Sequence, residues 1–548
     1  MLNKRAAFFL KIIYLFFVVF LISGCANRQL PQGGPRDRTP PKLLKATPPN
    51  MTRNFKAKVI QLDFDEYFKL NNIYQEITMS PTPAKLPEYK TKQKSIVIVL
   101  KDSLEKNTTY VINFGKSIAD VNEGNILKNF TYVFSTGSHI DSLSISGSVI
   151  NTLTQEREKD ATVMLFTLKQ DSAMFGKKKP SIYTSTDTAG NFTLSNLHPD
   201  DYRIYALKET TPNKIYDKDD ELIAFQKKNI HLTTDTSNVQ LKLFKQIPQK
   251  FRLVDRKFDA DGKMFFTFNK RLNDPSLKII YPVDFDKYKI VDISKTKDTA
   301  ILYMRNMAFD SIRIVFSDNN KPIDTTYFRK GLKETFTRNM LFSYNLNNDA
   351  KLKPGVDLTI KANYPIDNFD SSLISLKEDS TDISNFNLVR DTSNLKLFTL
   401  QYRWRQNANY TLIISEGAFT DIYGGKNKRQ PPRRFQIDKP ENYSLLTLKV
   451  TVPDTSKQYV VELLNDRKNV LRSDIIRKSG SIIYKNYLTG KYQVRVVYDA
   501  NKNGKWDSGN VKLRLQPENI WVDEAIITLR PNWEQETAVS IPKESTTP

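Results

Sequence analysis

The chain has 548 residues, and its 83 lysine and arginine residues outnumber its 60 aspartate and glutamate residues, which gives a formal net charge of +23. One cysteine and three histidines exclude a disulfide framework and leave few groups for thiol or imidazole catalysis. The basic residues are spread along the chain, which argues against a nucleic acid partner and favours attraction to anionic surfaces.

The N-terminus has the parts of an export signal. Lys4 and Arg5 give a positive start, residues 12–22 form an apolar stretch too short to span a bilayer, and small residues precede the cysteine in Leu21-Ile22-Ser23-Gly24-Cys25. This motif resembles the lipobox of bacterial lipoproteins. The resemblance implies that residues 1–24 are a lipoprotein signal peptide that is removed, and that Cys25 is then lipidated. An ordinary secretory signal that ends near a cysteine is the alternative.

Residues 25–38 are predicted to be a flexible tether behind the lipidated cysteine. They are rich in proline and glycine and show no apolar periodicity. A lipid anchor and a tether together predict a location in the cell envelope, attached to the outer membrane by the N-terminal lipid.

Three motifs at the end of the first folded segment return about 300 residues later. The matching pairs are Tyr110 and Tyr410, Asp120 and Asp421, Gly124 and Gly425, and Phe134 and Phe435. Alternating strands such as residues 58–64, bounded by turn residues, predict an antiparallel β-sandwich for each copy. We expect the aspartate and glycine of each copy to form a turn, with a cation site as the alternative.

The start Thr39-Pro40-Pro41-Lys42-Leu43 and the closing Phe134-Ser135-Thr136-Gly137 resemble the bacterial immunoglobulin-like (Ig-like) domains first described in S-layer proteins. Residues 39–137 match that pattern well. Residues 341–438 match its second half, and residues 248–340 form a more degenerate copy. The resemblance implies three Ig-like sandwiches.

A second motif lies between these copies. It consists of Gly190, Phe192, Leu197, Tyr202 and Ile204, and it resembles the transthyretin-like, or carboxypeptidase regulatory-like, β-sandwich. The resemblance implies such a domain at residues 141–246. A second one is expected at residues 442–548, where the end of the motif returns. Both would be struts or binding modules without catalysis. We name the five predicted domains, 39–137, 141–246, 248–340, 341–438 and 442–548, regions 1 to 5.

One loop of region 5 has the spacing of a calcium-binding loop. Its oxygen ligands at positions 1, 3, 5 and 9 are Asp499, Asn501, Asn503 and Asp507, and Gly504 stands at position 6. Asn510 stands at position 12, where calcium loops have a glutamate. We therefore expect the four side chains to bond the backbone of their own loop while Trp506 plugs the edge of the sandwich, with a weak or structural calcium site as the alternative and no other cofactor. Residues 209–217, with Tyr216, form a degenerate counterpart.

The sequence shows no motif for catalysis. A phosphate-binding glycine loop, a nucleophile elbow and a paired-histidine metal motif are all missing from the 548 residues, and we expect His139, His198 and His231 on the surface. Triplets such as Asp102-Ser103-Leu104 resemble the O-glycosylation sequon of Bacteroidetes, a phylum that the lysine, asparagine and tyrosine content also fits.

The patterns together predict an all-β protein of tandem antiparallel β-sandwiches, Ig-like and transthyretin-like, behind a lipoprotein signal and a flexible tether. We expect a non-enzymatic envelope protein that binds a protein partner at the outer membrane, in one version docked on a β-barrel complex. A surface glycan-binding or adhesin lipoprotein is the alternative. A hydrolase would need a converging pair of carboxylates that the sequence does not reveal.

Overall fold

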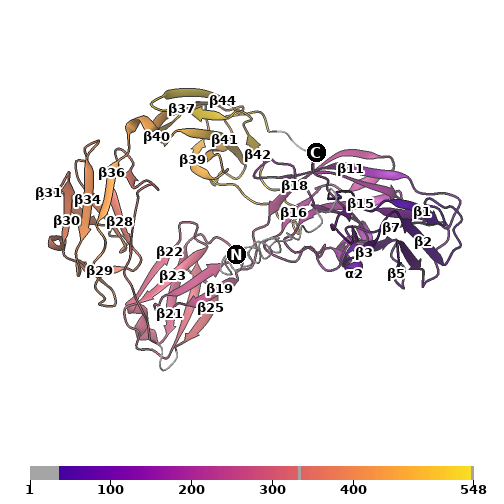
Figure 1. The fold of residues 1–548 in the computed structure, drawn as a ribbon, viewed down its shortest axis with the longest axis horizontal. Helices are drawn as coiled ribbons and strands as arrows, with labels where there is room; N and C mark the ends of the chain where they lie inside the picture. Colours follow the sequence, from indigo (N-terminus) through magenta and orange to yellow (C-terminus); the bar gives the residue numbers. More distant parts are fainter. Residues whose placement is uncertain (1–35, 331–334, 545–548) are drawn as a thin grey trace, which may run out of the picture. The chain divides into compact units, whose positions relative to one another are not determined.

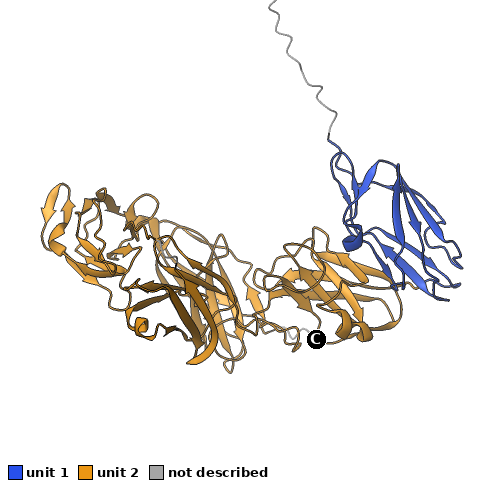
Figure 2. Ribbon diagram, turned by 90° about the horizontal axis from the view of Figure 1, so that it is seen from below, with its two compact units in different colours: residues 1–140 blue, residues 141–548 orange. Residues whose placement is uncertain are grey.

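The computed structural model describes residues 36–330 and 335–544, so the predicted signal and Cys25 lie outside the described residues. Two compact units divide the chain, one ending at Ile140 and one beginning at Asp141 (Figure 2). Strands dominate both units (Figure 1), which confirms the all-β fold class. The helices α2 (Ile73–Glu76) and α3 (Leu168–Met174) are short, and in the described ranges no helix combines the length and apolar character needed to span a bilayer.

Region 1 lies in the first unit. Its strands are β1 (Leu43–Thr47), β2 (Val59–Phe64), β3 (Phe68–Leu70), β4 (Thr78–Ser80), β5 (Glu88–Lys92), β6 (Ser95–Val99), β7 (Thr109–Asn113), β8 (Ile118–Asp120), β9 (Ile126–Leu127) and β10 (Thr131–Ser135). The main sheets have the orders β1-β2-β6-β5 and β10-β7-β4. Ile60 and Leu62 alternate with more exposed neighbours along β2, so period-two patterning directs one face of this strand into the core.

Region 4 repeats this arrangement in the second unit. Its strands are β26 (Phe342–Tyr344), β27 (Lys351–Leu352), β28 (Leu358–Ala362), β29 (Ile366–Phe369), β30 (Ile374–Glu378), β31 (Thr381–Ile383), β32 (Asn387–Arg390), β33 (Leu397–Gln401), β34 (Asn409–Ile414), β35 (Phe419–Asp421) and β36 (Arg433–Ile437). The sheet β26-β28-β33-β32 corresponds to β1-β2-β6-β5 of region 1, and the second sheet has the order β27-β36-β34-β30-β31.

The repeated tyrosines have the same role in regions 1 and 4. The N–H of Glu105 donates to the Tyr110 hydroxyl at 2.9 Å, and the N–H of Arg405 donates to the Tyr410 hydroxyl at 2.6 Å. Each ring also stacks on the phenylalanine of the last strand, with centroids 5.5 Å and 5.4 Å apart. Each tyrosine therefore ties the chain five residues upstream to the sandwich core, as in the tyrosine corner of Ig-like folds.

The repeated aspartates form turns. The Asp120 carboxylate accepts the N–H of Glu123 at 2.6 Å, of Gly124 at 2.9 Å and of Asn125 at 2.8 Å. Burial opposes ionisation, but these donors lower the pKa of Asp120 overall. The predicted match of Gly124 with Gly425 is wrong by one residue. Gly124 has a φ of +76° and Gly424 has a φ of +84°, because the turn of region 4 is one residue shorter.

Region 3 has a simpler sandwich. Its strands are β19 (Leu253–Phe258), β20 (Met264–Phe268), β21 (Pro275–Tyr281), β22 (Lys289–Ile293), β23 (Thr299–Met304), β24 (Ser311–Asp318) and β25 (Lys321–Arg329). They form the sheets β19-β20-β23-β22 and β21-β24-β25. The buried side chains of β20, Met264, Phe266 and Phe268, fill the space between the two sheets.

Regions 2 and 5 share a second arrangement. Region 2 has β11 (Leu143–Asn151), β12 (Thr162–Thr167), β13 (Ile182–Ser185), β14 (Asn191–Leu197), β15 (Asp200–Lys208), β16 (Leu222–Phe225), β17 (Ile230–Leu232) and β18 (Thr236–Lys245). Region 5 has β37 (Tyr443–Thr451), β38 (Gln458–Asn465), β39 (Val470–Ile476), β40 (Gly480–Leu488), β41 (Gly490–Asp499), β42 (Ile520–Val522), β43 (Ile527–Leu529) and β44 (Glu534–Ser540). Tyr202 donates to the carbonyl of His198 at 2.9 Å, and Tyr492 donates to that of Leu488 at 2.6 Å.

The first and last strands of regions 2 and 5 pair in parallel. β11 lies beside β18, and β37 lies beside β44. These pairs, and the short parallel pair β27 with β36, depart from the predicted antiparallel pattern. Alternation of apolar residues fixes which face of a strand is buried, but it contains no information about the direction of the neighbouring strand. The division into five domains itself stays a prediction, with which the sheets and the buried clusters agree.

Candidate functional site

The loop with the spacing of a calcium-binding loop connects β41 to β42. Asp499 is 1% exposed, and its carboxylate accepts the N–H of Asn503 at 3.1 Å, the N–H of Gly504 at 2.7 Å and the side-chain amide of Gln458 at 2.6 Å. The amides of Asn501 and Asn503 both donate to Oδ2 of Asp507, the latter at 2.6 Å. The structure therefore brings the four predicted residues together in one hydrogen-bonded loop.

Glu518 is a third acidic residue of this loop, after Asp499 and Asp507, and the sequence analysis missed it. Its carboxylate accepts the N–H of Ala500 at 2.8 Å and that of Asp507 at 3.0 Å. Burial raises the pKa of Glu518, and the charges of Asp507 and Asp499 raise it further. Glu518 lies well beyond the twelve-residue spacing of a calcium loop, so the motif gave no signal for it.

The counterpart loop of region 2 folds in the same way. Glu209 accepts the N–H of Asn213 at 2.7 Å and that of Lys214 at 3.0 Å, as Asp499 does in region 5. The amide of Asn213 donates to Asp217 at 3.1 Å, and Glu221 accepts the N–H of Asp217 at 3.0 Å, as Glu518 does for Asp507. The degenerate sequence thus keeps these hydrogen bonds of the loop although its first and third ligand positions and its glycine have changed.

We expect thermal melts of the protein in calcium and in chelator to be identical. In residues 36–330 and 335–544, no three or more His, Cys, Asp or Glu side chains are grouped to hold a metal ion. Asp507 already binds two amides, and Asp499 binds two backbone N–H groups and Gln458. If the loop bound calcium, a concentration of about 100 times Kd would stabilise the fold by about 2.7 kcal/mol. A raised melting temperature that Asp499→Ala abolishes would contradict this expectation and assign calcium to the loop.

After Asp507, the loop between β41 and β42 packs against region 2. Val511 is 5% exposed and lies in one buried cluster with Phe225 and Phe244. Gly509 approaches so closely that a Cβ at this position would lie 2.7 Å from the Phe244 ring, so only glycine fits. Trp506, which the sequence placed at the edge of its own sandwich, packs against this cluster of region 2 as well as against Val460 and Val497 of region 5.

Polar bonds surround this apolar contact. Gln516 donates to the carbonyl of Phe225 at 2.7 Å, Arg514 donates to the carbonyls of Gln226 and Lys227, and the side-chain oxygen of Gln246 accepts the N–H of Val511 at 2.8 Å. Each of these groups on region 2 belongs to the end of β16 or β18, or to the residues directly after them. We name residues 506–516 the docking loop, because they bind region 5 to region 2 within the second compact unit.

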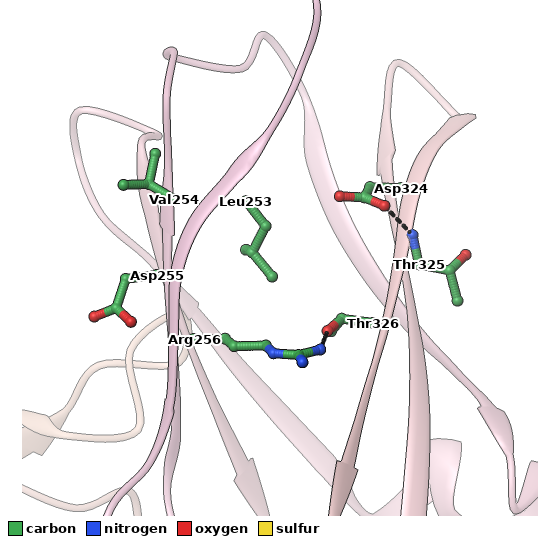
Figure 3. A pocket seen from close by; sticks show the side chains of 7 residues that line it. All are labelled: Leu253, Val254, Asp255, Arg256, Asp324, Thr325 and Thr326. Carbon is green, nitrogen blue, oxygen red and sulfur yellow. Dashed lines mark hydrogen bonds between the residues drawn. The ribbon is translucent and has the colours of Figure 1, made fainter. Parts of the chain in front are cut away.

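Region 3 contains a polar groove between the edges of its two sheets. Leu253, Val254, Asp255 and Arg256 of β19 line one side, and Asp324, Thr325 and Thr326 of β25 line the other (Figure 3). Arg256 reaches across the groove and donates to the Thr326 hydroxyl and to the carbonyl of Tyr327, the latter at 3.3 Å. Its guanidinium also lies 5.4 Å from the centre of the Tyr327 ring.

The three histidines are exposed, as predicted. His198 lies 3.3 Å from Asp141, and His231 lies 2.7 Å from Asp201; both are surface pairs. Exposed pairs of this kind contribute little to stability.

A comparison with protein families finds one match, in region 1. Residues 37–136 match the family model of bacterial Ig-like domains, so this part of the chain is similar to those domains. No curated protein matches the chain.

Solved structures that resemble the chain include two bacterial proteins. The major pilin subunit BcpA of Bacillus cereus is 10% identical, with a TM-score of 0.14, over 73% of this chain and 99% of the pilin. The Bacteroides ovatus mixed-linkage glucan utilization locus protein SGBP-B, in complex with a heptasaccharide, is 12% identical, with a TM-score of 0.18, over 63% of this chain and 85% of that protein. At these scores the likeness supports no argument about function.

Proposed function

We propose that this protein is a non-enzymatic, lipid-anchored scaffold of the bacterial cell envelope, which binds a protein partner at the outer membrane. The docking loop is the observation that supports a scaffold most directly. It binds region 5 to region 2 through one buried apolar cluster and several hydrogen bonds. The first and last regions of the second unit are therefore in contact. Such contacts resist separation of domains and suit a protein that positions a partner.

The anchor in this proposal is the lipid on Cys25, and docking on a β-barrel complex is its most specific version. The excess of basic over acidic residues would add attraction to anionic headgroups or lipopolysaccharide phosphates near the anchor. This attraction raises the local concentration of the protein at the membrane and has no sequence specificity.

The alternative, a glycan-binding or adhesin lipoprotein, is favoured by one feature of region 3. Tyr281 on β21, Arg313 on β24 and Tyr327 on β25 are neighbours across one sheet, and the two tyrosines are 57% and 63% exposed. A row of two exposed aromatic rings with a guanidinium between them is a surface on which sugar rings could stack.

Affinity purification of the tagged protein from native membranes in mild detergent tests the proposal. We expect a stoichiometric envelope protein, identified by mass spectrometry, to purify with it. Recovery of the protein alone, with bound glycan, would contradict the scaffold and favour the alternative. In that case Tyr327→Ala should weaken glycan binding, while Tyr67→Ala, which removes an equally exposed tyrosine from region 1, should not.

A further inference from the structure

We propose that region 3 binds an extended peptide segment of a protein partner, which pairs in parallel with β25 along the groove between β19 and β25. This inference goes beyond the scaffold role and does not depend on the lipid anchor. It rests on a comparison of regions 1, 3 and 4. In regions 1 and 4, a segment of the same region covers the outer edge of the last strand.

In region 1 the chain crosses from one sheet to the other before β2. Within residues 48–58, Met51 donates to the carbonyl of Val133 at 2.7 Å, and Phe55 donates to that of Ser135 at 2.9 Å. Thr52 forms a parallel bridge with Phe134. This crossing segment therefore covers the outer edge of β10, the last strand of the domain.

Region 4 covers its last strand in the same way. Within residues 345–357, β27 pairs in parallel with β36, Lys351 opposite Gln436 and Leu352 opposite Ile437. The N–H of Asp438 donates to the carbonyl of Leu352 at 2.8 Å, and Leu352 is fully buried in the core. An extended segment parallel to the last strand is thus part of the sandwich in both regions.

In region 3 the connection between the first two strands is too short to make this crossing. Only residues 259–263 connect β19 to β20, and they form a tight turn in which the N–H of Asp259 donates to the carbonyl of Lys263 at 2.9 Å and Gly262 has a φ of +87°. Among the described residues, β25 pairs with β24 alone along its nine residues. An unpaired strand edge is a template for another strand, and extended peptides bind to such edges through main-chain hydrogen bonds.

The groove beside this edge indicates the chemistry of the segment. Arg256 binds two neutral oxygens there, the Thr326 hydroxyl and the Tyr327 carbonyl. A carboxylate would form a stronger, charge-assisted bond with the guanidinium, in a bidentate geometry that neither neutral oxygen can offer. We therefore assign an extended segment with an acidic side chain opposite Arg256 as the occupant of the groove.

Hydrogen exchange on the full chain in detergent tests this inference. The probe is a synthetic peptide with the sequence of residues 345–356, which contains β27 and Asp349. We expect the peptide to slow exchange of the amides of residues 321–329. Arg256→Glu should abolish the effect by charge repulsion. Lys278→Glu reverses a charge on β21, at the far edge of the sheet that contains β25, and should leave the effect intact.

Crosslinking gives a second readout that does not depend on the folding of the Arg256 variant. A photoreactive phenylalanine analogue in place of Thr325 should crosslink to the peptide. The same analogue in place of Gln436, whose strand edge is already covered by β27, should not.

Three results would overturn the inference. One is unchanged exchange at residues 321–329 with about 1 mM peptide, a concentration that detects even weak binding. Another is equal protection in the Arg256→Glu protein. The third is protection that rises with protein concentration in the absence of peptide, which would identify a second copy of this chain as the occupant. None of these results depends on membrane attachment, so failure here and failure of the proposed scaffold can be distinguished.

Discussion

Val511→Asp is expected to detach the docking loop from region 2. Val511 is 5% exposed in one buried cluster with Phe225 and Phe244, and the guanidinium of nearby Arg514 is already bonded to the carbonyls of Gln226 and Lys227. Its burial contributes about 1.5–3 kcal/mol, and an unpaired carboxylate is not stable in such an apolar site. Because a loop can move into water more easily than a core strand, we expect the loop to leave and the charge to become solvated.

Hydrogen exchange and urea unfolding measure this effect. Amides of residues 508–516 and of β16 should exchange faster in Val511→Asp, and the 141–548 unit should lose about 2–4 kcal/mol of unfolding free energy, within the range for disrupted buried contacts. Leu513→Asp is the matched control, since Leu513 lies two residues away on the same loop and is 61% exposed. Equal exchange in both variants would show that the docking loop is not held by its apolar contact.

The repeats were predictable because their contacts are local or concern two neighbouring strands. Tyr110 and Tyr410 each bond the backbone five residues upstream and stack on the last strand, so one short motif contains most of the interaction. The one-residue error at Gly425 has the same origin. An alignment at a constant offset matches the two aspartates correctly. The glycine with positive φ lies one residue closer to the aspartate in region 4, because that turn is one residue shorter.

Contacts between distant segments could not be predicted in this way. Trp506 was expected to cover its own sandwich, but it also packs on region 2, because the partners Phe225 and Phe244 lie more than 250 residues earlier in the chain. Glu518 joins the loop through backbone N–H groups that no motif marks. These contacts depend on which surfaces of the folded regions pack together, and the periodicity of apolar residues along a strand does not predict this.

The groove of region 3 is an intermediate case. The sequence already shows that residues 259–263 are fewer than the corresponding residues 345–357 of region 4. The difference shows that the crossing segment is missing only when the end of β19 and the start of β20 are known. Comparison of the connections between predicted strands, in addition to the motifs, would have revealed it.

The lipid anchor is the part of the proposed function with the largest expected effect. Each buried methylene of an acyl chain contributes about 0.8 kcal/mol to membrane binding, so one chain gives marginal attachment and several chains give stable attachment. Basic residues alone would give binding that salt weakens. Removal of the only cysteine should therefore abolish salt-resistant membrane attachment completely.

Membrane fractionation of cells that produce the unmodified protein or Cys25→Ala tests this most directly, with a high-salt wash of the membranes and Asn27→Ala as a control that keeps the cysteine. We predict that the unmodified protein and Asn27→Ala remain in the washed outer-membrane fraction and that Cys25→Ala is found in the soluble fraction. Retention of Cys25→Ala in the washed membranes, at the level of the unmodified protein, would contradict a lipid-anchored scaffold.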